Sequence, residues 1–220
     1  MKKAALHNLG CKVNAYETEA MQHLLEEAGY EIVPFTQKAD VYVINTCSVT
    51  NMADRKSRQM LHKAKKNNPD SIVVAAGCYV QTSEKEVLND LSVDIVIGND
   101  RKHDLVRLLE EYSLDSVNDT VDDINDGKHD FEELFIDQTK EHTRAFIKVQ
   151  DGCNQFCSYC IIPYARGRVR SRRFENVIAE VERLAANGFK EVVLTGIHLS
   201  SYGVDFEEAT GLLELIQAVK

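Results

Sequence analysis

The sequence lacks any apolar stretch close to the ~18 to 20 residues that a membrane-spanning helix requires. Its N-terminus also lacks the long apolar core and small-residue cleavage site of a signal peptide, because the charged start leads into a short strand-like run. We therefore expect a cytoplasmic protein with no membrane partner. The 220 residues, 44% hydrophobic and 28% charged, are typical of a globular chain with one large or two modest domains.

An excess of basic charge is also missing, since the chain carries a formal net charge of −9. Most of this charge comes from residues 113–142, where ten acidic residues outnumber two lysines and give a net charge of −8. The rest of the chain is nearly neutral. The acidity therefore does not exclude a nucleic-acid partner, because it is confined to one segment.

Residues 1–112 alternate strand-like and helix-like runs, which predicts an α/β domain with an open parallel sheet and helices on both of its faces. The helix at 15–28 has a plausible N-cap in Asn14 and a plausible stop in Gly29. The predicted strands are 4–9, 31–35, 41–44, 72–76 and 95–97, and the other predicted helices are 53–66, 84–91 and 102–112.

Residues 143–220 resume the alternation after the acidic segment, which we interpret as a linker or a loosely packed excursion. The predicted elements are a strand at 144–149, a helix at 176–186 ended by Gly188, a strand at 192–194 and a helix at 212–219. About two β/α units are too few to close a barrel. We therefore expect domains at 1–112 and 143–220, the second incomplete, joined by the acidic linker at 113–142.

Three cysteines, Cys153, Cys157 and Cys160, lie within eight residues. A structural zinc ion normally takes four protein ligands, whereas three thiolates suit a [4Fe–4S] cubane with one iron left open for a substrate or cofactor. The alternatives are zinc completed by a distant histidine, a disulfide with one spare thiol, or chance. Disulfides are rare in cytosolic proteins, so the cluster is favoured.

The other three cysteines, Cys11, Cys47 and Cys78, are far apart in the sequence. Each lies at or just beyond the C-terminal end of a predicted strand, and in a parallel sheet these ends share one edge, where open α/β sheets bind ligands. The spacing alone leaves two alternatives open: a second three-thiolate site, or cysteines that are simply buried.

These segments resemble the radical-SAM methylthiotransferase family over nearly the whole chain except the acidic linker. The N-terminal likeness lies in residues 8–19 (NLGCKVNAYETE), 45–50 (NTCSVT) and 76–78 (AGC). The second half matches at residues 151–172 (DGCNQFCSYCIIPYARGRVRSR) and 194–203 (LTGIHLSSYG). The resemblance implies that residues 143–220 form the first β/α units of a radical-SAM partial barrel. It also implies two [4Fe–4S] clusters, one on each cysteine set, with S-adenosylmethionine bound near Tyr159 and Gly196.

Within the family, residues 10–17 most resemble the branch that modifies N6-threonylcarbamoyladenosine at position 37 of tRNA. The resemblance implies that a 5′-deoxyadenosyl radical abstracts hydrogen from C2 of the adenine, and that the second cluster supplies the methylthio sulfur. Implied partners are tRNA, an electron donor such as flavodoxin or ferredoxin, and a sulfur donor. We nominate no acid–base catalytic residue, because a radical abstraction needs none to start.

Three alternatives remain: a sibling enzyme acting on isopentenyladenosine, one acting on an aspartate of a small-subunit ribosomal protein, and a non-enzymatic iron–sulfur or zinc protein such as a redox sensor. The family continues into a fuller partial barrel and a β-rich RNA-binding domain. We therefore expect this chain to be a fragment whose activity alone is doubtful.

The roles of two basic runs and of one histidine are not decided by the sequence. For Arg166, Arg168, Arg170, Arg172 and Arg173 the alternatives are tRNA phosphate contact, packing around the clusters and a solvated face. The basic helix at 53–66 is favoured as a solvated face, and His198 as a structural residue. The sequence has no aromatic-stacking signature of a dedicated RNA module.

Overall fold

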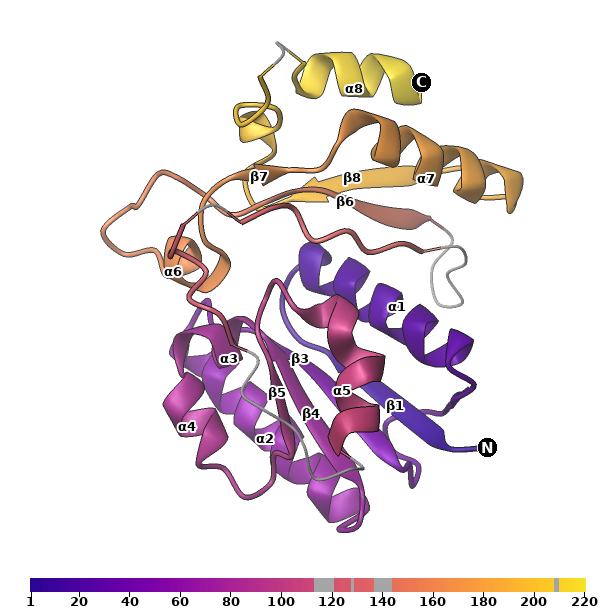
Figure 1. Ribbon diagram of the computed structural model, residues 1–220, viewed down its shortest axis with the longest axis vertical. Coiled ribbons are helices and arrows are strands. Elements are labelled where there is room, and N and C mark those ends of the chain that lie inside the picture. The colour runs from indigo at the N-terminus through magenta and orange to yellow at the C-terminus, as the bar shows by residue number, and fades with distance from the viewer. Residues whose placement is uncertain (113–120, 128, 137–143, 208–209) are drawn as a thin grey trace.

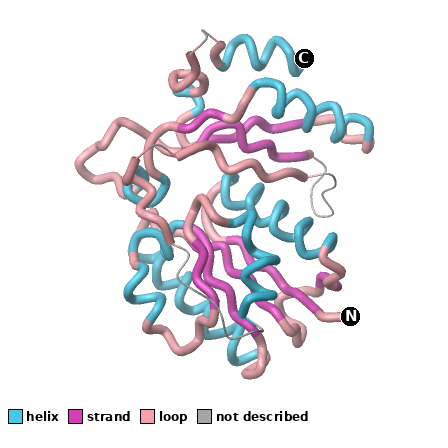
Figure 2. The backbone as a smooth tube through the Cα atoms, viewed as in Figure 1, coloured by secondary structure: helices cyan, strands magenta, loops and turns pink. Residues whose placement is uncertain are grey.

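The computed structural model describes residues 1–112, 121–127, 129–136, 144–207 and 210–220, which form two α/β units (Figures 1 and 2). The first unit has a five-stranded parallel sheet in the order β2-β1-β3-β4-β5. Its strands are β1 (Lys3–Asn8), β2 (Glu31–Ile32), β3 (Val41–Thr46), β4 (Ile72–Gly77) and β5 (Ile95–Ile97). Its helices are α1 (Lys12–Glu27), α2 (Asn51–Asn67), α3 (Cys78–Thr82), α4 (Glu84–Leu88), the 3₁₀ turn η1 (Lys102–Asp104) and α5 (Leu105–Tyr112).

Alternating side chains of the central strands bury both faces of this sheet. In β3, Tyr42 and Ile44 pack with residues of α2, α3 and α4, whereas Val41 and Val43 pack with residues of α1 and α5. Helices therefore cover both faces, as Figure 2 shows. The strand order is that of a doubly wound fold, whose ligands bind at the carboxyl edge where the order reverses, between β1 and β3. The predicted fold class is confirmed for this unit.

The second unit has a three-stranded sheet in the order β7-β6-β8, in which β6 pairs in parallel with β8 and antiparallel with β7. Helices α7 and α8 pack with β6 around a shared apolar core, which gives the expected opening β/α units. The elements are β6 (Ala145–Asp151), α6 (Ile162–Arg166), β7 (Arg170–Ser171), α7 (Phe174–Ala186), β8 (Val192–Gly196), η2 (Leu199–Ser201) and α8 (Leu212–Val219).

Helix α1 lies between the two sheets, where it contacts the first sheet on one side and β6 and β8 on the other (Figure 1). Its Tyr16 and Ala20 pack with Leu134 and Ile136 of the acidic segment, all at most 3% exposed. Residues 131–136 are therefore a packed part of the contact between the units, not a loose excursion. The domain boundaries remain a prediction.

The sequence-based element boundaries needed several corrections. Helix α1 begins at Lys12 with Cys11 as its N-cap, so the assignment of Asn14 as N-cap is wrong. The Asn14 side chain instead donates to the carbonyls of Leu9 and Thr46, at 2.7 and 2.9 Å, and so ties α1 to two strand ends. The short elements α3, α6 and β7 were missed, because two to five residues give no readable periodicity.

Candidate functional site

Cys11, Cys47 and Cys78 follow three neighbouring strands of the first sheet at its carboxyl edge. Cys47 follows the last residue of β3, Cys78 opens α3 directly after β4, and Cys11 caps α1 after β1. Thr46 and Gly77 are paired in register, which brings the next residues, Cys47 and Cys78, side by side. The structure thus brings this set together at the edge where the strand order reverses.

A glycine beside the first cysteine set allows a close approach to the Cys47 side chain. Gly10 has a φ of +106°, and a Cβ atom there would lie 2.9 Å from both Cβ and Sγ of Cys47. Burial raises the pKa of the Cys47 thiol, and Cys78 and Cys11 raise it further. The three sulfurs therefore lie within electrostatic range of one another, two of them buried and that of Cys11 exposed.

The second cysteine set lies on the loop between β6 and α6. Cys157 is exposed, whereas Cys153 and Cys160 are partly buried. The Cys153 N–H donates to the Gly167 carbonyl at 3.0 Å, and the Cys160 N–H donates to the Cys157 carbonyl at 2.9 Å. The first bond ties the start of the loop to the residue after α6, and the second closes a turn between Cys157 and Cys160.

Gly152 fixes the start of this loop, and we predict that Gly152→Ala distorts it. Its φ is +69°, and a Cβ atom there would lie 1.8 Å from the carbonyl oxygen of Arg168, a backbone atom. We expect a loss of about 2–3 kcal/mol in the free energy of unfolding. Gly188→Ala is the control, because its φ is +93° with no atom within 4 Å, and it should cost about 1 kcal/mol. Urea unfolding measures both, and equal losses would contradict the prediction.

Neither cysteine set suits a single metal ion. Across the described ranges, no group of three or more His, Cys, Asp or Glu side chains is arranged to hold one ion. A cubane is several ångströms wide, so its ligands stand farther apart than those of a mononuclear site. The three-thiolate composition fits a [4Fe–4S] cluster in each set, and the first set also lies at the sheet edge where such folds bind ligands.

Between the two units lies a cluster of buried charges centred on Glu17 of α1. Its carboxylate accepts from Arg166 at 2.6 and 3.0 Å and from Lys148 at 2.7 Å, and lies 3.3 Å from Lys102. Asp151 lies 2.6 Å from Lys148 and 3.1 Å from Arg166. All five side chains are at most 2% exposed. We call this set, with Arg170, which lies 3.7 Å from Asp151, the Glu17 cluster.

The cations of the Glu17 cluster keep both carboxylates ionised. Burial by itself would raise the pKa of Glu17, but Arg166, Lys102 and Lys148 together hold it well below its usual value. Burial likewise opposes ionisation of Asp151, yet Arg166, Lys148 and Arg170 lower its pKa strongly. Charge pairing therefore outweighs desolvation at this contact.

A second buried set joins Tyr16 of α1 to Arg172 and Glu180 of the second unit. Arg172 pairs with Glu180 and donates to Glu133 at 2.9 Å, and the Tyr16 hydroxyl donates to the Leu134 carbonyl at 2.5 Å. Arg172 also donates to the same carbonyl at 3.1 Å. Both buried sets depend on arginines of the 166–173 run.

The arginine run therefore splits between buried and exposed positions. Arg166, Arg170 and Arg172 are at most 5% exposed, so a solvated face is wrong for these three, whereas Arg168 and Arg173 are exposed. In α2, Arg55, Lys56, Arg58, Lys63 and Lys66 are exposed, whereas Lys65 is partly buried and pairs with Asp94 at 2.7 Å. Exposure fits a solvated face and phosphate contact equally, so the favoured interpretation of this helix stays a prediction.

The proposed S-adenosylmethionine contacts lie at the same end of the second sheet. Tyr159 projects from the cysteine loop and is 90% exposed. Gly196 ends β8, where a Cβ atom would lie 3.0 Å from the Gln150 side chain. The Gln150 side-chain oxygen accepts from the His198 N–H at 2.7 Å, and His198 Nδ1 lies 2.6 Å from the Ser201 hydroxyl. His198 thus shapes the turn after β8.

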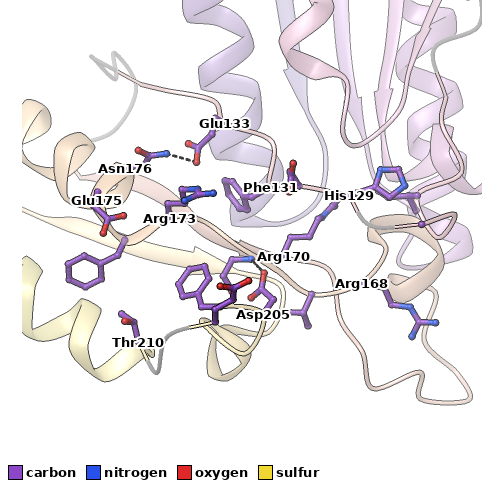
Figure 3. A pocket seen from close by; sticks show the side chains of 18 residues that line it. His129, Phe131, Glu133, Arg168, Arg170, Arg173, Glu175, Asn176, Asp205 and Thr210 are labelled. Carbon is purple, nitrogen blue, oxygen red and sulfur yellow. Dashed lines mark hydrogen bonds between the residues drawn. The ribbon is translucent and has the colours of Figure 1, made fainter.

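A cavity of about 900 Å³ lies in the second unit beside the acidic segment (Figure 3). Its lining comes from described residues of three segments, 124–133, 168–176 and 205–207 with Thr210, and includes none of the six cysteines. Figure 3 shows Arg170, Arg173, Glu133 and Asp205 around this space together with Phe131. Its volume lies in the range of small-ligand pockets, but its lining is richer in charged side chains than the mostly apolar lining of such pockets.

Comparison with known proteins accounts for both halves of the chain. Residues 3–98 match the uncharacterized protein family UPF0004, and residues 147–217 match the radical SAM superfamily. The threonylcarbamoyladenosine tRNA methylthiotransferase MtaB of Bacillus subtilis is 47% identical over 210 residues, which are 94% of this chain and 46% of that protein. The chain belongs to the radical-SAM methylthiotransferase family.

Other methylthiotransferases agree with this assignment. MtaB of Aquifex aeolicus is 45% identical over 98% of this chain and 53% of its own length. The tRNA-2-methylthio-N(6)-dimethylallyladenosine synthase of Thermoanaerobacter sp. (strain X514) is 35% identical over 96% of this chain and 46% of its own length. The chain thus spans about half the length of the curated relatives it matches.

The solved structure is that of the radical S-adenosylmethionine methyltransferase TsrM from Kitasatospora setae, with cobalamin and a [4Fe–4S] cluster bound. It has a TM-score of 0.60 at 14% identity and covers 91% of this chain and 48% of its own chain. At this identity the likeness confirms the fold.

The Glu17 cluster was not predicted from the sequence, although one signal pointed to it. Glu17 stands four residues after Val13 and four before Met21, and both of these are buried, so helical periodicity places the carboxylate on the core face. Lys148 similarly interrupts the apolar strand β6. A charge at a core position requires a partner, but the sequence does not show which one.

Proposed function

We propose that this methylthiotransferase, in its complete form, adds a methylthio group to C2 of N6-threonylcarbamoyladenosine at position 37 of tRNA. The observation that carries the proposal is the convergence of Cys11, Cys47 and Cys78 at one sheet edge, in a chain that holds a second three-cysteine set on the loop between β6 and α6. A redox sensor with one iron–sulfur site needs only one such set. The 47% identity to MtaB favours this substrate over isopentenyladenosine, whose enzymes match at 35%.

The chain's own residues hold and orient the cofactors. Cys153, Cys157 and Cys160 would bind one [4Fe–4S] cluster, with Tyr159 and Gly196 beside S-adenosylmethionine. Cys11, Cys47 and Cys78 would bind the other. When bound, the clusters supply the electron that cleaves S-adenosylmethionine and the sulfur that is transferred. The buried charges between the units keep the two sites in a fixed relation.

The partners follow from this chemistry. We propose tRNA as the substrate, a flavodoxin or ferredoxin as the electron donor, a separate sulfur donor and a cytoplasmic location. Within the ranges that the structure describes, no helix is both long and apolar enough to cross a bilayer.

Nucleoside analysis tests the choice of substrate. We expect the protein, reconstituted without oxygen and given S-adenosylmethionine, a reductant and bulk tRNA, to add the mass of a methylthio group to N6-threonylcarbamoyladenosine alone. The matched control is the variant with Cys11, Cys47 and Cys78 replaced by alanine, which should yield no product. A methylthio group found only on isopentenyladenosine would overturn the substrate assignment.

A further inference from the structure

Arg166 of the second unit reaches the cysteine set of the first unit. Its Nη2 donates to Asn14 Oδ1 at 2.5 Å, and the same oxygen lies 3.8 Å from Cys11 Sγ. On the other side, Asn99 donates to the carbonyl of Ala165 at 2.6 Å and lies 3.6 Å from Cys78 Sγ. Two asparagines therefore link α6 to two of the three thiols.

The guanidinium of Arg166 also has an unused donor. Its side chain is fully buried, yet its Nε–H finds no hydrogen-bond partner among the described residues. A buried donor without a partner costs about 1–3 kcal/mol, so natural proteins rarely leave one. The Nη2 of the same guanidinium donates to Asn14 Oδ1, beside the Sγ of Cys11. An acceptor group is therefore expected on the side of the first cysteine set.

The charge of the Glu17 cluster points to the same conclusion. Lys102, Lys148, Arg166 and Arg170 bring four positive charges, whereas Glu17 and Asp151 bring two negative charges, all at most 5% exposed. The next carboxylate, Glu132, is also buried, contacts the half-exposed His103 at 3.2 Å and acts electrostatically on Lys148. Counting it still leaves the buried set with one more positive than negative charge. Buried charge is costly unless it is balanced. An anionic group near the cluster would balance it, and a cubane on three thiolates is anionic.

We propose that Arg166 is the cationic hydrogen-bond donor to the cluster held by Cys11, Cys47 and Cys78. The second unit would then complete the site of the first. The inference rests on the proposed function, because it requires a cluster on these cysteines. Arg166 is a positioning residue that acts through charge: a cation beside an iron–sulfur cluster favours the reduced state and raises its reduction potential.

The test compares reduction potentials in a background that retains one cluster. Cys153, Cys157 and Cys160 are replaced by alanine, and the remaining cluster is titrated potentiometrically and followed by electron paramagnetic resonance. We expect Arg166→Gln to shift the potential to more negative values and Glu17→Gln to shift it to more positive values. Arg166→Lys keeps the charge and should give a smaller negative shift.

Arg172→Gln is the matched control, since it removes a fully buried arginine from the separate set around Glu180 and should leave the potential unchanged. If Arg166→Gln fails to fold, the opposite shifts in Arg166→Lys and Glu17→Gln decide the question. Suppose that the alanine variant of Cys153, Cys157 and Cys160 still binds a cluster. Potential shifts of the same sign in both substitutions, or no shift, then overturn the role of Arg166 but leave the proposed function standing. A background protein that binds no iron overturns the proposed function as well.

Discussion

Replacing Cys153, Cys157 and Cys160 with alanine is expected to abolish the cleavage of S-adenosylmethionine to 5′-deoxyadenosine. These thiols lie on the closed loop after β6, where they would hold the cluster with an open iron. Without this cluster no electron reaches the sulfonium. We therefore expect a loss of at least about a thousandfold in 5′-deoxyadenosine formation, comparable to removal of an essential catalytic group.

The matched variant replaces Cys11, Cys47 and Cys78 with alanine. Because these residues lie in the other unit, we expect it to cleave S-adenosylmethionine but to transfer no sulfur. Chromatography of the nucleoside products separates the two activities. Full cleavage by the first variant, or equal loss of cleavage in both, would contradict the division of roles between the two cysteine sets.

Arg172→Ala is expected to lower the free energy of unfolding by about 3–5 kcal/mol, because it leaves a buried carboxylate without its cation. The side chains of Arg172 and Glu180 are both fully buried. The substitution also removes a donor to the carbonyl of Leu134, which the Tyr16 hydroxyl would then bond alone. Urea unfolding followed by circular dichroism measures the loss.

The control for this experiment is Arg173→Ala at the neighbouring, exposed position. A surface substitution of this kind should change the free energy of unfolding by less than about 0.5 kcal/mol. If Arg172→Ala lowers the free energy of unfolding no more than Arg173→Ala does, the ion pair with Glu180 does not stabilise the contact between the units.

Much of the fold could be predicted because its signals are local. The apolar runs at β3 and β4, the amphipathic stretch of α2 and the glycines that end α1 and α7 all reflect short-range periodicity and turn chemistry. The position of Cys11, Cys47 and Cys78 at the ends of predicted parallel strands also predicted a shared sheet edge, and the structure brings them together there. Whether they hold a cluster stays a prediction.

The rest depends on contacts between residues far apart in the chain. Glu17 and Arg166 are separated by 149 positions, so no local pattern pairs them. The packing of Leu134 and Ile136 against α1 was also not predicted, because the many acidic residues around them are typical of a solvated linker. The sequence alone does not show whether an arginine is buried or exposed, because burial depends on partners that lie far away in the chain.

The central claim is that the chain holds two separate three-cysteine cluster sites. Counting iron and acid-labile sulfide after reconstitution without oxygen tests it most directly, with the Cys153, Cys157 and Cys160 alanine variant measured in parallel. We predict about eight irons per chain, falling to about four in the variant, with equal sulfide. About four irons that all disappear in the variant, or one zinc per chain in place of iron, would contradict the claim.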